Sequence, residues 1–139
     1  MKVSFDFDST LDRKDVQRFA KELINDGIEV WIVTSRCTTE YATGKGWHWI
    51  DKQNLKLFRV ADDLGIKRKH IIFTNHAPKS EFIKGKDFIF HLDDDSDELI
   101  EILNSKDPCK PINANHFEWE YDCRKFVEIE KYLENPNKL

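Results

Sequence analysis

The sequence lacks the marks of several large classes of protein. No run approaches the roughly 18 apolar residues that a transmembrane helix requires. The first residues, MKVSFDFD, lack the apolar core of a signal peptide, so we expect a cytoplasmic protein with no membrane partner. Positive charge is not in excess, because the net charge is −4 with 35% of residues charged. This balance argues against binding nucleic acid by bulk charge, but a local basic groove stays open.

Cysteine and histidine do not form a familiar metal or disulfide framework. The three cysteines, Cys37, Cys109 and Cys123, contain no CxxC pair. The five histidines contain no HxH or HExxH spacing. Zinc knuckles and disulfide scaffolds are therefore disfavoured, and we expect free or buried thiols and ordinary histidines.

Short apolar runs alternate with longer amphipathic ones along the chain. The short runs predict strands at Lys2–Phe7, Glu29–Val33, His70–Phe73, Asp87–Leu92 and Pro111–Asn113. Helical spacing and caps predict helices at Asp12–Asp26, Asn54–Leu64, Pro78–Ile83, from the acidic run after Leu92 to Asn104, and at Asp122–Leu133. This order predicts an α/β fold, a three-layer Rossmann-like sandwich with a mainly parallel five-stranded sheet. We expect a single domain over residues 1–139, without repeats or linkers.

Aspartates lie where two of the predicted strands end. Asp6 and Asp8 lie at the end of the first strand with one residue between them, and alternate strand residues share a face, so both carboxylates can point into one volume. Asp93 and Asp94 leave a later strand at the same edge of the sheet. A simpler interpretation makes the first pair caps of the next helix. So much negative charge in one place is best offset by magnesium.

Polar residues at other element ends point to a phosphate group. Thr34 and Ser35 follow the second strand, where hydroxyls and backbone N–H groups can hold phosphate oxygens, although such residues are common in turns. Lys79 begins a predicted helix, where the helix dipole disfavours a cation. A bound anion would relieve that misfit, and a solvated surface lysine is the simpler interpretation.

Taken in chain order, these elements resemble the four motifs of the haloacid dehalogenase (HAD) superfamily of phosphohydrolases. DFDST at Asp6–Thr10 matches the first motif, IVTSR at Ile32–Arg36 the second, Lys79 the third, and HLDDD at His91–Asp95 the fourth. The resemblance covers roughly the first 105 residues. The first motif is fairly specific, and the order of all four strengthens the other three.

The resemblance has one departure and one consequence for domain structure. Ser9 stands where the family most often has glycine. Only 25 residues separate Asp8 from Thr34, which is enough for one helix and one strand. The chain therefore resembles a HAD-like hydrolase without a separate cap domain, and such open members tend to accept large substrates, including nucleic-acid ends.

The resemblance implies a magnesium-dependent phosphatase that hydrolyses a phosphate monoester through an aspartyl-phosphate intermediate. Asp6 would be the nucleophile and Asp8 the general acid and base, while Lys79 neutralises charge. The phosphoryl group would be bound by Thr34, Ser35, Arg36 and Lys79. The implied metal ligands are Asp6, the backbone carbonyl of Asp8, and Asp94, with Asp93 as the second candidate because the aspartate doublet leaves the register open.

Aromatic residues raise the question of substrate. Trp47, His48 and Trp49 lie in a predicted loop from Cys37 to Gln53, where they could stack on a nucleobase or simply pack the loop onto the body. Phe117, Trp119 and Tyr121 alternate, which favours an extended segment against the core. The phosphorylated substrate is thus left as a small molecule, such as a nucleotide, or a nucleic-acid end.

Two other functions share these residues. A phosphoacceptor domain carries its acceptor aspartate at the end of the third strand, where this chain has Thr74 and Asn75 instead. A HAD-fold phosphate- or metal-binding protein without turnover is the second alternative, which the presence of both Asp6 and Asp8 disfavours. No obligate protein partner is evident from the sequence.

Overall fold

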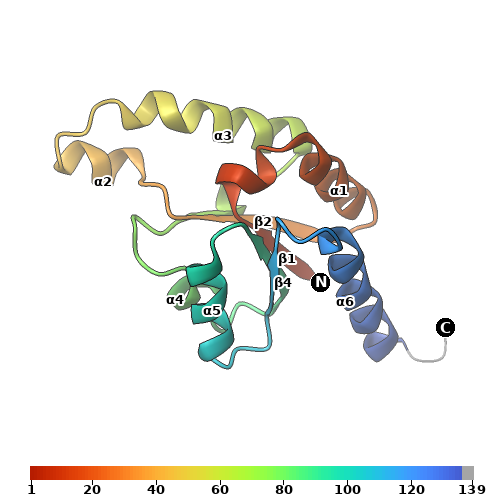
Figure 1. Ribbon diagram of the computed structural model, residues 1–139. Coiled ribbons are helices and arrows are strands. Elements are labelled where there is room, and N and C mark those ends of the chain that lie inside the picture. Colours follow the sequence, from red (N-terminus) through yellow and green to blue (C-terminus); the bar gives the residue numbers. More distant parts are fainter. Residues whose placement is uncertain (136–139) are drawn as a thin grey trace.

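The sheet has five strands, and all of them run parallel (Figure 1). The computed structural model describes residues 1–135. In spatial order the strands are β3 (Ile71–Phe73), β2 (Glu29–Thr34), β1 (Lys2–Phe5), β4 (Phe88–Asp93) and β5 (Lys110–Asn113). The predicted α/β class is confirmed, with a wholly parallel sheet. A single domain over residues 1–139 without a cap stays a prediction, and its last four residues lie outside the described ones.

Helices cover both faces of the sheet and make the three layers (Figure 1). One face carries α1 (Lys14–Asn25), α3 (Ile50–Leu64) and α6 (Trp119–Glu134). The other face carries α4 (Ser80–Ile83) and α5 (Ser96–Asn104). The remaining helix, α2 (Thr39–Gly44), lies beside α3. Between residues 1 and 135, no helix has both the length and the apolar composition needed to cross a membrane.

The larger apolar layer fills the space between the sheet and α1, α3 and α6. Phe5, Phe19 and Phe90 meet there with ring centroids 5.6 to 6.4 Å apart, and Trp119 packs against Phe19 at 5.5 Å. Burying such rings is the main favourable contribution to folding. A smaller cluster lies under α4 and α5. All three cysteines are free and buried, as expected.

The predicted loop from Cys37 to Gln53 is wrong in part, because α2 and the first turn of α3 lie within it. Thr38 begins α2, and its side chain accepts a hydrogen bond from the backbone N–H of Tyr41. Asn54 is not a helix cap either. It is buried inside α3, and its side-chain amide donates to the carbonyl of Cys37 at 2.9 Å. The contact between Asn54 and Cys37 thus explains why Asn54 lies within α3, which local composition did not indicate.

Several element ends also differ from prediction. The first strand ends at Phe5 rather than Phe7, and the fourth continues to Asp93. The alternating aromatic residues after His116 do not form an extended segment, because α6 begins at Trp119. Trp119 is buried while Tyr121 is 64% exposed, so the alternation reflects the two faces of a first helical turn.

The strand order places one crevice at the centre of the sheet. From β1 the chain moves outward through β2 to β3, then crosses back to β4 on the other side of β1. Ligands bind beyond the carboxyl ends of the strands at such a reversal. Phe5 is in register with Leu92, so the residues that follow them, Asp6 and Asp93, reach this crevice together.

Candidate active site

A tight turn after β1 gives Asp6 and Asp8 different directions. The backbone N–H of Asp6 still donates to the carbonyl of Leu92 at 2.8 Å, which ties it to the sheet. The chain then turns through Phe7–Leu11, with Ser9 in the left-handed region at φ 58°. That conformation is easiest for glycine and explains why glycine suits this position. Asp6 ends up 5% exposed, whereas the side chain of Asp8 is 52% exposed.

Three carboxylates meet at the crevice around a buried lysine. Asp6, Asp93 and Asp94 each have an oxygen within 4.8 Å of the others. We call these three residues, together with Lys79, the acidic centre. Lys79 Nζ donates to Asp6 Oδ1 at 2.7 Å and to Asp93 Oδ2 at 2.6 Å. Lys79 is only 2% exposed, so its interpretation as a solvated surface lysine is wrong.

Burial and like charge set the protonation of the acidic centre. Burial, followed by the negative charge of Asp93, raises the pKa of Asp6 to about 8. Burial alone would also raise the pKa of Asp93, but the hydrogen bond from His91 and the charge of Lys79 outweigh it and lower that pKa. Burial acts to lower the pKa of Lys79, and the two carboxylates reverse this and raise it. Lys79 and Asp93 therefore form a charged pair. The raised pKa of Asp6 reflects the cost of placing a further buried negative charge beside Asp93.

The donor set fits a hard divalent cation. Carboxylate oxygens are the ligands that Mg²⁺ prefers, and the three here approach one another closely enough to share an ion. One lysine cannot neutralise three carboxylates. The raised pKa of Asp6 indicates that its negative charge is not fully compensated by Lys79. Asp94 accepts a long contact at 3.4 Å from the hydroxyl of Thr10, and its hydrogen bond with Asp6 is one of the smaller causes that raise the pKa of Asp6.

A buried histidine supports the acidic centre from beneath. His91 lies on β4 and is fully buried; its Nε2 lies 2.8 Å from Asp93 Oδ2 and its Nδ1 2.8 Å from Ser4 Oγ. Burial lowers the pKa of His91, which favours the neutral ring. A carboxylate only accepts hydrogen bonds, so Nε2 carries the proton and Ser4 donates to Nδ1. This role of His91 could not be predicted from the sequence. Its only indication there is that His91 lies two positions before Asp93, so the two share a face of the strand.

The backbone of Lys79 is anchored separately from its ammonium group. Its N–H donates to Glu98 Oε2 at 2.9 Å, which links the start of α4 to the first turn of α5. Asp95 caps that turn, accepting hydrogen bonds from the backbone N–H groups of Asp97 and Glu98. The acidic run therefore serves both the helix and the site: its first residues enter the acidic centre, and its last holds Lys79 in place.

Asp8 and Arg36 form a forked ion pair at the rim of the crevice. Arg36 Nε donates to Asp8 Oδ2 at 2.9 Å, and Nη2 donates to Asp8 Oδ1 at 2.7 Å. Arg36 also donates to the carbonyl of Gln53, and its guanidinium lies 5.1 Å from the ring of Phe7. The carboxylate of Asp8 thus faces Arg36 rather than the acidic centre, and Arg36, which was predicted to bind the phosphoryl group, forms its two-pronged contact with an acid of this chain.

The ends of β2 and β3 bring hydroxyls to the same edge. Thr34 is buried and its Oγ1 accepts from the backbone N–H of Arg36 at 3.2 Å. Ser35, which follows, is half-buried, and its carbonyl accepts from the backbone N–H of His76 at 2.9 Å. Thr74 is buried too, and among residues 1–135 its hydroxyl has no hydrogen-bond partner. These residues therefore lie at the edge where a phosphate was predicted.

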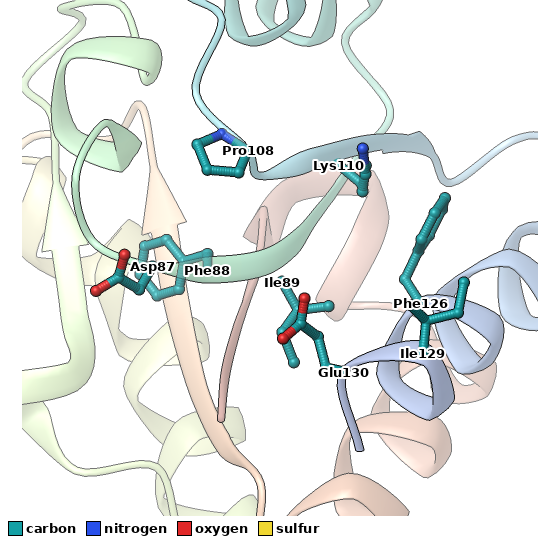
Figure 2. A pocket seen from close by; sticks show the side chains of 8 residues that line it. All are labelled: Asp87, Phe88, Ile89, Pro108, Lys110, Phe126, Ile129 and Glu130. Atoms are coloured by element: carbon teal, nitrogen blue, oxygen red, sulfur yellow. The ribbon is translucent and has the colours of Figure 1, made fainter. Parts of the chain in front are cut away.

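A separate cavity of about 450 Å³ opens at the opposite end of β4 (Figure 2). Its lining combines apolar side chains with Asp87, Lys110 and Glu130, from β4, β5 and α6. Phe88 at one end of β4 lies five residues from Asp93 at the other, or roughly 16 Å at the strand rise. The acidic centre and this cavity are thus distinct places in the molecule.

Comparisons with protein-family models, with curated proteins and with solved structures found no match to this chain. What the site does is therefore argued from its residues and their geometry.

Proposed function

We propose that this chain is a magnesium-dependent phosphatase of the HAD type, acting on a phosphate monoester through an aspartyl phosphate. One observation carries the proposal: a buried aspartate, a buried lysine and two further aspartates meet at the reversal of a parallel sheet. Nucleophilic carboxylates, a fixed cation and oxygen ligands for a metal are the parts that phosphoryl transfer requires.

In the first step Asp6 attacks phosphorus, a bond forms between its carboxylate oxygen and phosphorus, and the ester P–O bond breaks. The departing oxygen takes a proton from the carboxylic acid of Asp8. In the second step water attacks the same phosphorus, its proton passes to Asp8, and the bond to Asp6 breaks. Inorganic phosphate and the free carboxylate of Asp6 are released.

The other residues position these two acids and the phosphoryl group. Lys79, 2.7 Å from Asp6, stabilises the carboxylate form and the charge on the transferring group. Thr34 and the backbone of Ser35 would hold phosphate oxygens. Arg36 would release Asp8 from its fork when it binds the phosphoryl group. When bound, Mg²⁺ would offset charge on the phosphate oxygens.

The contacts of the aspartate doublet favour one metal-binding register. Asp93 accepts hydrogen bonds from Lys79 and His91, whereas Asp94 contacts neither of these two and is paired with Thr10 at 3.4 Å and with Asp6, itself a proposed ligand. We therefore assign Asp94, with Asp6 and the backbone carbonyl of Asp8, as the metal ligands. Asp94→Asn is expected to weaken Mg²⁺ binding at least as much as the roughly tenfold loss that altered partners of metal ligands cause. Calorimetric titration of Mg²⁺ into the protein measures this, with Asp97→Asn as the control.

The decisive test is hydrolysis of p-nitrophenyl phosphate with Mg²⁺. The unmodified chain is expected to release p-nitrophenol, chelation should stop it, and Asp6→Asn should lower the rate to the background. Asp8→Asn should lower kcat by roughly 10²–10⁴-fold. Asp12→Asn is the matched control, because this acid follows the same turn and lies outside the acidic centre. Equal rates for Asp6→Asn and the unmodified chain would refute the assignment of the nucleophile.

The alternative is a protein of the same fold that binds a metal and phosphate without turnover. The forked pair of Asp8 and Arg36 is the observation that favours it, because it holds the proposed acid and base away from the acidic centre. Metal-dependent binding of phosphate esters, with no hydrolysis across a broad panel, would establish this alternative in place of the phosphatase.

A further inference from the structure

Four rings gather on the segments that follow β2 and β3. Trp47 lies in the middle, with its centroid 6.2 Å from Tyr41, 6.5 Å from Trp49 and 6.3 Å from His76. We call these four residues the aromatic rim. Trp49 is 56% exposed and Tyr41 is 36% exposed, so large ring surfaces face solvent. Covering them would be favourable, which makes the rim a candidate binding surface.

The rim is not a closed aromatic core. Elsewhere Trp31 and His70 stack on each other, with centroids 4.6 Å apart and planes 27° apart. The three contacts of Trp47 are tilted by 36° to 82°, and none is a parallel stack. The ammonium group of Lys45 lies 5.6 Å from the centroid of the Tyr41 ring, whereas Trp49 is 56% exposed and its contact with Trp47 is tilted. Trp49 is therefore the member of the rim whose ring surface is most accessible to another planar ring.

Backbone hydrogen bonds join the rim to the proposed phosphate site. The N–H of His76 donates to the carbonyl of Ser35 at 2.9 Å, and the N–H of Asn75 donates to the carbonyl of Arg36 at 3.2 Å. Asn75 and His76 both adopt positive φ, 53° and 69°. Residues other than glycine hold that conformation only where their surroundings fix it. The side chain of Asn75 accepts from the N–H of Thr38 at 2.9 Å, which also fixes the start of α2.

We propose that the aromatic rim is the subsite for the nucleobase of the phosphate ester whose phosphoryl group binds at the acidic centre. The inference rests on the proposed function, since it extends the same site to a substrate class. His76 connects the two places: its ring lies 6.3 Å from that of Trp47, and its backbone N–H donates to the carbonyl of Ser35. Stacking on aromatic side chains is how nucleobases bind without regard to sequence.

Two matched esters test the subsite. AMP and ribose 5-phosphate carry the same phosphorylated sugar and differ by the adenine ring alone. The unmodified chain is expected to have the lower KM for AMP. Trp49→Ala should raise the KM for AMP by roughly 5- to 150-fold, the range that loss of one base stack produces. It should leave kcat/KM for ribose 5-phosphate unchanged, and Trp49→Phe, which keeps a ring, should retain most of the preference.

The control is Tyr121→Ala, which removes an equally exposed ring from α6. This variant should change the kinetic constants neither for AMP nor for ribose 5-phosphate. The subsite is overturned if AMP and ribose 5-phosphate are used equally well. It is also overturned if Trp49→Ala slows both esters to the same extent, because the rim would then support the fold or another partner rather than a base.

Binding without turnover separates this inference from the proposed function. Asp6→Asn can be titrated with AMP and with ribose 5-phosphate by calorimetry, in the presence and absence of the Trp49→Ala change. Tighter binding of AMP that depends on Trp49 supports the subsite even if no ester is hydrolysed, in which case only the phosphatase proposal fails. Binding of AMP no tighter than that of ribose 5-phosphate overturns the subsite whatever the turnover.

Discussion

The acidic centre and the aromatic rim lie near the same edge of the sheet, yet the chain holds them in opposite ways. Asp6, Lys79 and Asp93 are at most 5% exposed, and each bonds to another member. The rings of Tyr41 and Trp49 lie at the surface on a segment outside the sheet. Charges that must act on phosphorus need fixed, dry positions, whereas a stacking surface needs only to be flat and accessible. The residues of the proposed phosphoryl transfer are thus anchored in the core, and those of the proposed base recognition are not.

Removing the side chain of Lys79 should have the largest effect on the free energy of unfolding. Lys79→Ala leaves Asp6 and Asp93 buried without their shared cation, so we expect a loss of about 3–5 kcal/mol in the free energy of unfolding. Urea unfolding at pH 8 without divalent cations measures it. Lys84→Ala, on an exposed lysine near the end of the same helix, should stay within about 0.5 kcal/mol. If the two variants were equally stable, the buried ion pairs of Lys79 would contribute no more to stability than an exposed lysine does.

The pH dependence of stability probes the charge on Asp6. Its pKa is raised from 3.8 to about 8 on folding, so its stabilising contribution is complete below pH 3.8 and is lost as the pH rises through about 8. Asp6→Asn lacks this titration. The Tm of the variant minus that of the unmodified chain should therefore rise between pH 4 and pH 8, measured with a chelator present. His91 is common to both proteins, so its own titration cancels in the difference.

Adding Mg²⁺ at pH 8 should reverse that trend. The cation compensates the carboxylate of Asp6, so it should raise the Tm of the unmodified chain more than that of Asp6→Asn. A Tm difference that did not change with pH would mean that Asp6 is not a buried, uncompensated acid.

The histidine beneath the centre should have an intermediate effect. His91→Leu removes the donor to Asp93 and leaves the hydroxyl of Ser4 with only the longer contact to the carbonyl of Phe90 at 3.4 Å, which we expect to cost about 1–3 kcal/mol. His91→Gln retains an amide donor and should cost less. Urea unfolding compares the two variants, and an equal loss in both would assign His91 to packing alone.

A substitution in the aromatic rim should change the free energy of unfolding least. Trp49→Ala removes a ring that is 56% exposed, so we expect the free energy of unfolding to change by no more than about 0.5 kcal/mol. Thermal or urea unfolding measures it beside the Lys79→Ala variant. A loss as large as that of a core substitution would remove the contrast between the two regions and would make Trp49 a structural residue.

Much of the fold could be predicted from local sequence. All five strands lie close to their predicted places. β2 and β4 are nearly continuous apolar runs, as is typical of buried parallel strands, whereas β5 has only one buried residue, Ile112. Gly65 ends α3 in a left-handed conformation and Asp95 caps α5, so both of these helix boundaries are also set by local sequence. The helix α2 was missed because its six polar and small residues have no apolar periodicity. Its start depends on Thr38, which is itself held by Asn75 of a distant segment.

The sequence by itself determined which acids, hydroxyls and lysine reach the carboxyl edge, since strand ends and helix starts are local features. It did not determine which of them meet. Lys79 joins Asp6 across 73 residues and Asp8 joins Arg36 across 28, while His91 reaches Ser4 on the neighbouring strand. These pairings follow from β1 lying between β2 and β4. Only the folded sheet decides them, because hydrogen bonds and ion pairs act over a few ångströms and chain order does not set distance in space.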